Sequence, residues 1–231
     1  MRNPLILLLA TLILPIQAKA YWLRPAAYGT VGSYSYHRAA LSLDGGWKEK
    51  NFDPYVSSEL ATDNYQRTFT LTAGASKALD STLRGRAGAG FVTGHVQDTN
   101  GGSASAILEL GLDKDLGPGT LLGGYSLTAG KVATAAYARD KRGRTTSTLR
   151  TQSQTYNAFS GGYRLPLDGF ALIFRETVGM ASEESALYTT AVTVSVPFGP
   201  AKAWNISSTL SADAGASSGA YLGAGLSYLF E

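Results

Sequence analysis

The last ten residues of the chain, 222–231, alternate between apolar and small side chains. The apolar set is Leu222, Ala224, Leu226, Tyr228 and Phe230, and the small set is Gly223, Gly225 and Ser227. Successive side chains of a β-strand point to opposite faces, so this pattern predicts a strand with one apolar face and one weakly polar face. Such a strand fits the wall of a membrane barrel, with lipid outside and a lumen inside, and it also fits the end of a soluble β-sandwich.

The same segment, LGAGLSYLFE, resembles the C-terminal sorting signal of bacterial outer-membrane proteins, in which apolar residues alternate toward an aromatic end. Leu226, Tyr228 and Phe230 carry the resemblance, and the aromatic residue is penultimate because Glu231 follows it. The resemblance implies a β-barrel in the outer membrane of a Gram-negative bacterium, with the barrel-assembly machinery as a partner.

Residues 1–20 have the three parts of a secretory signal peptide. Arg2 supplies a positive start, residues 5–16 supply an apolar stretch, and Ala18-Lys19-Ala20 supplies a small-x-small cleavage site. The apolar stretch is shorter than the roughly 20 residues of a membrane-spanning helix, which argues against an anchor. We therefore expect cleavage after Ala20 and one barrel domain over residues 21–231.

Composition narrows the function classes. Loss of residues 1–20 leaves 18 basic and 17 acidic side chains, a formal charge of +1, which gives no electrostatic basis for nucleic-acid binding. The sequence contains no cysteine, so it can form neither a disulfide nor a thiolate metal site. No apolar run after residue 20 is long enough for a transmembrane helix, so a membrane location requires strands.

Short and long polar breaks alternate along the chain. The short breaks are 79–81, 116–119, 166–169 and 198–201, and the long ones are 44–64, 97–102, 138–152, 182–185 and 213–218. Bacterial barrels have tight periplasmic turns and longer extracellular loops. The spacing therefore predicts an all-β, antiparallel up-and-down transmembrane barrel of about ten strands, with eight or twelve as alternatives and both termini in the periplasm. The predicted strands are 30–43, 65–78, 82–95, 103–114, 120–137, 152–165, 169–181, 186–197, 202–212 and 219–230.

Charged residues of the strands should face the lumen or the rims, because a charge at mid-depth on the lipid face costs about 2–4 kcal/mol. The alternation predicts that Arg84, Arg86, Glu109 and Asp113 face the lumen, where arginine–carboxylate pairs are plausible in a register that the sequence does not define. The direction of Glu176 is ambiguous, because the alternation of its strand turns it toward lipid unless a bulge or a position at the rim intervenes. A ten-stranded barrel has little interior space, so we do not expect a wide pore; the lumen would hold a thin water column or a plugged polar core, and we favour the plugged core.

The sequence offers little for catalysis. His37 and His95 are the only histidines, and neither belongs to the His-x-Ser pair that outer-membrane lipases and deacylases use. His95 with Asp98 resembles a fragment of the rim site of omptin-like proteases but lacks its further aspartates. Two histidines without cysteine also fall short of the ligands that zinc takes. We predict no enzyme activity, no catalytic or metal site and no cofactor.

Two of the predicted loops contain candidate contact residues. Segment 44–64 interleaves Trp47, Phe52 and Tyr55 with carboxylates, an arrangement that suits glycan binding or a lid that packs its own aromatic rings. Segment 138–152 contrasts a single acid, Asp140, with a group of basic residues, Arg139, Lys141, Arg142, Arg144 and Arg150. Guanidinium groups bind phosphate as a bidentate fork, so this loop fits lipopolysaccharide as well as simple solvation.

These observations favour a non-enzymatic outer-membrane barrel that acts through its extracellular loops as a surface-contact or structural envelope protein. The alternative is a narrow channel or export port, for example in a polysaccharide system, lined by the four lumen-facing charges. A rim hydrolase that uses His95 is the remote third hypothesis. The expected partners are membrane lipid, lipopolysaccharide, the assembly machinery and, for the first loop, a glycan.

Overall fold

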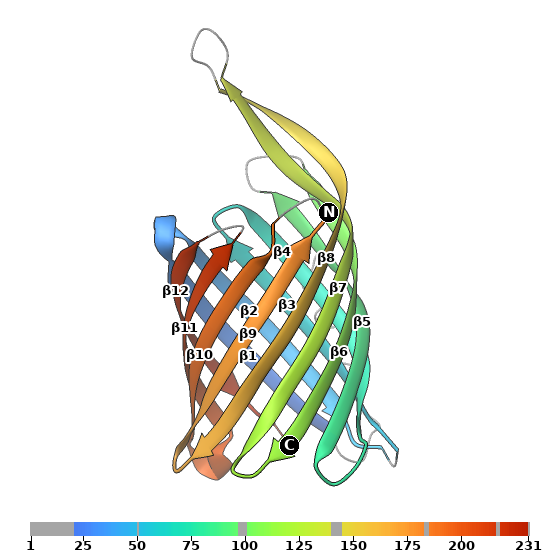
Figure 1. Cartoon of the computed structure of the whole chain (residues 1–231), viewed down its shortest axis with the longest axis vertical. Helices are drawn as coiled ribbons and strands as arrows, with labels where there is room; N and C mark the ends of the chain where they lie inside the picture. The colour runs from blue at the N-terminus through green and yellow to red at the C-terminus, as the bar shows by residue number, and fades with distance from the viewer. Residues whose placement is uncertain are drawn as a thin grey trace.

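The computed structural model describes residues 21–49, 51–96, 101–139, 145–182, 185–215 and 218–230. Within these residues, twelve antiparallel strands form one closed barrel (Figure 1), in which each strand pairs with its sequence neighbours and β12 pairs with β1. The strands are β1 (Tyr21–Gly32), β2 (His37–Trp47), β3 (Asp53–Asp63), β4 (Gln66–Ala78), β5 (Leu83–Val96), β6 (Gly102–Leu116), β7 (Gly119–Arg139), β8 (Thr145–Leu167), β9 (Phe170–Ala181), β10 (Leu187–Phe198), β11 (Trp204–Gly215) and β12 (Gly219–Tyr228).

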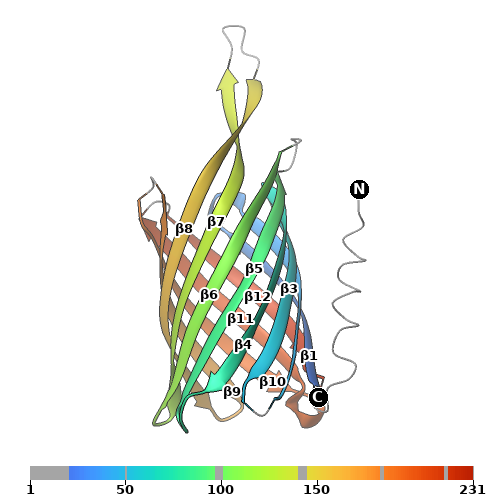
Figure 2. The same ribbon diagram turned by 90° about the vertical axis from the view of Figure 1, so that its right-hand side faces the viewer.

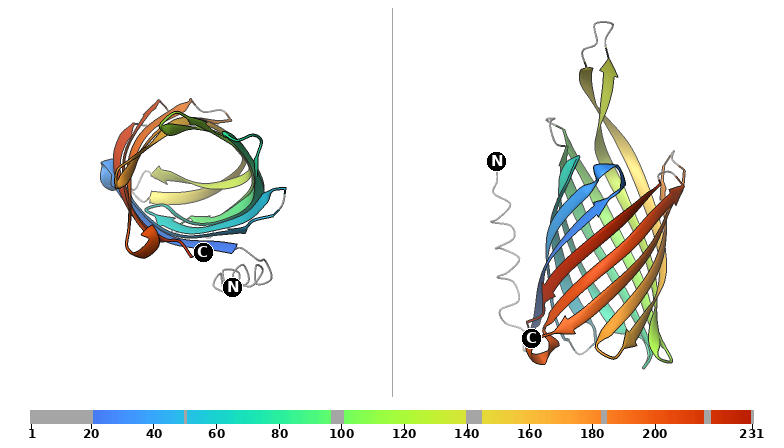
Figure 3. Two further views of the ribbon diagram at one scale, coloured as in Figure 1. Left: turned by 90° about the horizontal axis from the view of Figure 1, so that it is seen from below. Right: turned by 90° about the vertical axis from the view of Figure 1, so that its left-hand side faces the viewer.

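Two short 3-10 turns complete the described elements, η1 (Ser33–Ser35) between β1 and β2 and η2 (Pro200–Lys202) between β10 and β11. No helix in the described part of the chain is long and apolar enough to cross a membrane. The start of β1 and the end of β12 lie at the same end of the barrel (Figure 3), where Leu23 pairs with Phe230. We call this end the terminal end and the opposite one the far end.

The expected class, an antiparallel up-and-down barrel, is confirmed, but the estimate of ten strands is too low and the alternative of twelve is correct. The ten predicted strands correspond to β2 and to β4 through β12, while β1 and β3 were missed. Strand β3 lies inside segment 44–64, so the prediction of one long loop there is wrong. Its polar composition makes it resemble a loop in sequence, yet Asp53, Ser57 and Glu59 belong to the lumen-facing half of an alternating strand.

The tight turns at the terminal end follow their sequence signals. Gly117 and Gly169 have positive φ angles of 58° and 81°, which glycine adopts without a steric penalty. Asp80 shapes the β4–β5 turn by accepting hydrogen bonds from the backbone N–H and hydroxyl of Thr82 and from the N–H of Leu83. The hydrogen bonds from Thr82 lower the pKa of the Asp80 carboxyl below its ordinary value, because they stabilise its charged form.

Large apolar side chains cover the outer face of the wall. Leu41, Leu110, Phe159, Leu210 and Leu222 are all exposed there, on strands distributed around the whole barrel. At the terminal end, outward aromatic rings form a chain of contacts. The ring centroids are 6.2 Å apart for Phe198 and Trp204, 4.7 Å for Trp204 and Tyr228, and 4.4 Å for Tyr228 and Phe230. This chain matches the aromatic girdle that outer-membrane barrels place at a lipid interface.

Glycines on the inner face let neighbouring side chains lie flat. A Cβ atom at Gly74 would be 2.7 Å from Cζ of Tyr55, and one at Gly88 would be 2.5 Å from the Tyr55 hydroxyl. The Tyr55 ring therefore lies along the wall, across β4 and β5, instead of projecting into the barrel. This arrangement accounts for part of the high glycine content and keeps the lumen open.

We expect Gly90→Ala to destabilise the barrel. A Cβ atom at Gly90 would overlap the carbonyl oxygen of Leu71 and lie 2.7 Å from Cα of Thr72, and overpacking of this kind costs about 1–3 kcal/mol. The matched control is Gly29→Ala on the outer face, where the nearest atom, the Arg38 carbonyl oxygen, is 3.7 Å away. Urea titration of refolded protein, followed by the heat-dependent gel shift, measures both. Equal midpoints for the two variants would contradict the assignment of Gly90 to a crowded wall.

Candidate functional site

The lumen contains a cavity of about 800 Å³ that extends inward from the terminal end. Its wall is polar and includes charged residues of both signs. The cationic ones are Arg24, Lys48, Arg84, Arg86 and Arg175, and the acidic ones are Asp44, Asp53, Glu59, Glu109 and Asp113. The cavity wall therefore has five cations and five anions and no net excess of either.

Strand alternation and register bring these residues together. Arg84 is directly opposite Asp113 and Gly88 opposite Glu109 in the β5–β6 pair, so the four charges expected to face the lumen all line the cavity. Arg175 reaches the same cavity from β9. The interior is wider than the sequence suggested because two additional strands enlarge the circumference.

Some of the wall charges are paired. Arg24 forms an ion pair of 2.9 Å with Asp44, whose other carboxylate oxygen accepts a hydrogen bond of 2.6 Å from Ser57. Arg84 pairs with Asp53 on β3 at 3.3 Å, although the register places Asp113 directly opposite it. Farther from the terminal end, the Arg38 guanidinium donates a hydrogen bond to the Glu59 carboxylate. These pairs link strands β1, β2, β3 and β5.

Arg86, Arg175, Glu109 and Asp113 have no ion-pair partner within 4.0 Å among the described residues. Arg86 lies along the wall over Gly111, where a Cβ atom would be 2.9 Å from its Cδ. Gly111 sits between Glu109 and Asp113 on the inner face of β6, so the guanidinium lies between two carboxylates without pairing with either. These four charges are free to interact with a solute in the cavity.

The other side of the lumen presents hydroxyl groups. Strands β10 and β11 lie six strands away from β4 and β5 around the barrel. Their inner faces hold a ladder of side-chain hydrogen bonds: Thr193–Thr209 at 2.8 Å, Ser195–Asn205 at 2.8 Å and Thr189–Asp213 at 2.7 Å. The alternating serines and threonines of β11 were visible in the sequence, but their position opposite the charged wall depends on the strand count.

The proposed glycan-contact residues do not form one loop. Tyr55 lines the lumen cavity, Trp47 ends β2 opposite Tyr21, and Phe52 lies in the short β2–β3 connection at the terminal end. His95 pairs with Gly102 and lies at the far end of β5, away from the cavity, and Asp98 is outside the described residues. In the described part of the chain, no three histidine or acidic residues are placed to hold a metal ion.

The basic segment 138–152 belongs to a projecting hairpin. Strands β6 and β9 pair with β7 and β8 only as far as Lys131 and Tyr156, and beyond them β7 and β8 continue as a two-stranded ribbon (Figure 2). Arg139 belongs to β7 and Arg150 to β8 within this ribbon, whereas Lys141, Arg142 and Arg144 are outside the described residues.

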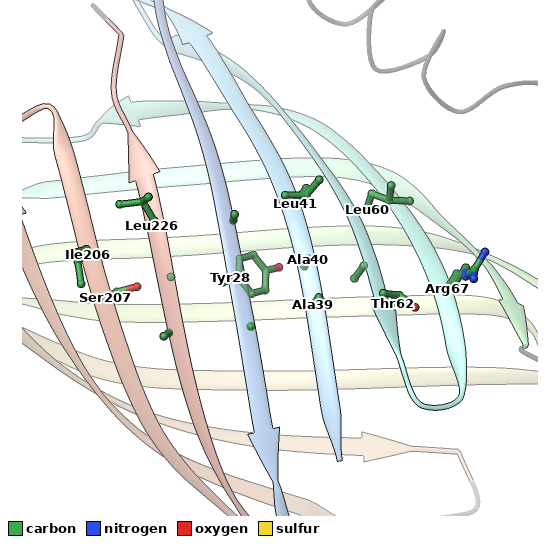
Figure 4. A pocket seen from close by; sticks show the side chains of 15 residues that line it. Tyr28, Ala39, Ala40, Leu41, Leu60, Thr62, Arg67, Ile206, Ser207 and Leu226 are labelled. Carbon is green, nitrogen blue, oxygen red and sulfur yellow. The ribbon is translucent and has the colours of Figure 1, made fainter. Parts of the chain in front are cut away.

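A second hollow, of about 870 Å³, lies against the outer wall (Figure 4). Small outward residues and larger apolar ones line it together: Ala27, Gly29, Ala39 and Ala224, and Leu41, Leu60, Ile206 and Leu226. An apolar hollow on the lipid side of a membrane barrel is a surface for lipid. The lumen cavity, with its charges and hydroxyl groups, is therefore the candidate functional site.

No family model matches the sequence, and no curated protein matches it. Solved structures with the same fold include the KdgM porin, with a TM-score of 0.61 and 10% identity over 90% of this chain and 99% of that one. The NanC porin has a TM-score of 0.57 and 13% identity over 88% and 98%. A TodX monoaromatic hydrocarbon channel lacking S2 and S3 has a TM-score of 0.60 and 7% identity over 91% and 90%.

The closed barrel and these likenesses define the class of fold. The chain has a closed, porin-like β-barrel fold, and a β-barrel is the fold that the sorting-signal resemblance implied.

Proposed function

We propose that the protein is a narrow channel through which small hydrophilic solutes cross the outer membrane. The observation that carries this proposal is the lumen cavity, whose wall offers charges of both signs together with hydroxyl groups such as those of Ser126, Ser160 and Thr177. The sequence favoured a surface-contact role and held the channel as its alternative. The cavity and the likeness to porins and channels support the alternative better.

The wall chemistry favours solutes rich in hydroxyl groups and low in net charge. Five cations and five anions line the cavity, so neither a polyanion nor a polycation gains overall attraction. Hydroxyl groups of the wall, such as those of Ser160 and Thr177, can exchange hydrogen-bond partners with the hydroxyls of a passing sugar. The KdgM porin has also been solved in complex with disordered oligogalacturonate, which is acidic; the balanced wall of this chain suits a less charged saccharide.

Single-channel recording tests the channel directly. Purified protein in planar bilayers should give discrete conductance steps with little preference between potassium and chloride, because the wall charges cancel. The double variant Arg86→Glu/Arg175→Glu leaves three cations and seven anions on the wall, and we expect the cation-to-anion permeability ratio to rise several-fold. Lys202→Glu in η2, outside the cavity lining, is the control and should leave the reversal potential unchanged. Correctly folded barrels that give no steps would overturn the channel.

A further inference from the structure

Glu176 is a carboxylate on the lipid side of the wall. It occupies the middle of β9, directly opposite Gly161 of β8 and Thr190 of β10, and the register on both sides is unbroken. Its neighbours Arg175 and Thr177 line the lumen cavity, so alternation turns Glu176 outward, where it is exposed. The sequence left its direction open, and the structure removes the bulge or rim position that would have hidden it.

The barrel satisfies this carboxylate only in part. The Thr190 hydroxyl donates a hydrogen bond of 2.8 Å to Oε2 of Glu176, and no cation lies within 4.0 Å among the described residues. Hydrocarbon chains offer no hydrogen-bond donor, and ionisable groups inside a membrane generally face another protein surface or an aqueous cavity. Glu176 therefore needs a donor from outside its own barrel.

The wall beside Glu176 allows a close approach. On the row of paired residues that runs from β9 to β7, Gly161 and then Gly123 follow Glu176. A Cβ atom at Gly161 would have no neighbour within 4 Å, and one at Gly123 would meet nothing nearer than 3.5 Å, so both positions are open. Small residues are what let two membrane surfaces pack backbone to backbone.

The same face contains suitable donors on the other side of Gly161. The Tyr125 hydroxyl of β7 donates a hydrogen bond of 2.8 Å to Oδ1 of Asn157 on the outer face, and the Tyr125 ring centroid lies 4.9 Å from that of Phe159. A carboxylate brought to this pair can accept from the Asn157 NH2 group, or take the one Tyr125 proton in place of Asn157 Oδ1. Figure 1 shows the strands leaning as they rise, so rows of paired residues climb from β7 to β9. Tyr125 lies one row toward the far end from Gly123, which brings it to a height similar to that of Glu176.

We propose that the β7–β9 face is a dimer interface for a second copy of this chain, with a two-fold axis along the membrane normal in front of β8. Such an axis places β9 of one copy opposite β7 of the other, so each Glu176 meets Tyr125 and Asn157 of the second copy. The contact is isologous and forms twice, as a two-fold axis requires. Phe159 lies near the axis, and the glycine pair admits the partner surface.

Cysteine cross-linking tests the interface, because the native sequence contains no cysteine. Phe159→Cys places a thiol near the axis, and Leu41→Cys places one on β2, six strands away, where the side chain is also exposed. After mild oxidation in native membranes, Phe159→Cys should give disulfide-linked dimers and Leu41→Cys should give few. Linked dimers at both positions or at neither would overturn the proposal; if Phe159→Cys does not assemble, Val178→Cys on β9 replaces it.

The carboxylate is tested in the Phe159→Cys background. Glu176→Leu removes both hydrogen bonds across the axis, and we expect about tenfold less linked dimer, with Tyr125→Phe acting in the same direction. Glu176→Gln keeps an acceptor and should retain most of the dimer. The heat-dependent gel shift confirms that each barrel has folded, and single-channel conductance should be unchanged because Glu176 lies outside the lumen. An unchanged dimer yield in Glu176→Leu contradicts the inference while leaving the channel standing.

Discussion

An epitope tag inserted after Glu49 should remain hidden from antibody on intact cells and become accessible when the outer membrane is permeabilised. The sequence alone predicts the opposite, because it places segment 44–64 in an extracellular loop. In the structure Glu49 belongs to the short link between β2 and β3 at the terminal end. The backbone N–H of Glu49 donates a hydrogen bond of 3.2 Å to the carbonyl oxygen of Phe52, which closes this turn. An even number of strands puts both termini on one side, and the sorting-signal resemblance implies an outer-membrane barrel, so we expect that end to lie in the periplasm.

Two further probes fix the orientation independently. A tag at Gly117, in the β6–β7 turn at the same end, should behave like the one after Glu49. Trypsin added to intact cells should cleave after Arg139, Lys141, Arg142 or Arg144, because the β7–β8 ribbon extends beyond the far end (Figure 2). Antibody binding to the Glu49 tag on sealed cells, with the ribbon protected, would show that the barrel is inverted.

The two missed strands show where alternation fails as a guide. In β3, outward Leu60 and Val56 alternate with Glu59 and Ser57, but Pro54 and the acidic residues give the segment the composition of a loop. Strand β1 directly follows the expected cleavage site, and its far-end connection to β2 is only four residues long, 33–36. Because the prediction assumed long extracellular loops, it did not recognise the short β1–β2 connection and assigned β3 to a loop.

The lumen-facing directions of Arg84, Arg86, Glu109 and Asp113 follow from period-two alternation and were within reach of the sequence. Their partners were not. Arg84 pairs with Asp53 of an unrecognised strand, and Arg86 avoids its neighbours by lying over Gly111. Ion pairing depends on the strand register and on which glycines leave room for a neighbouring side chain to lie along the wall. Neither can be derived from the sequence alone. The open cavity likewise depends on a circumference of twelve strands.

Phe230 closes the barrel in two ways. Its backbone N–H donates to the Leu23 carbonyl oxygen at 2.8 Å and its carbonyl accepts from the Leu23 N–H at 3.0 Å, which joins the two ends of the wall. Its ring also ends the outward aromatic chain, with its centroid 4.4 Å from that of Tyr228. The backbone of Phe230 therefore joins the end of the chain to β1, while its ring packs on Tyr228 and extends the outward aromatic chain of β11 and β12.

Phe230→Ala should reduce the amount of folded barrel in outer membranes by about tenfold, because each lost aromatic contact costs about 0.5–1.5 kcal/mol in addition to the lost burial. The loss should be larger during assembly than in refolded protein, since the ring belongs to the segment that resembles the sorting signal. Quantitative blots of unheated outer-membrane fractions measure the folded form, and Glu231→Ala, one residue further along, is the control that should remain near the native level. Equal, normal levels of both variants would show that the seam closes through its backbone hydrogen bonds alone and that the terminal aromatic residue is dispensable for sorting.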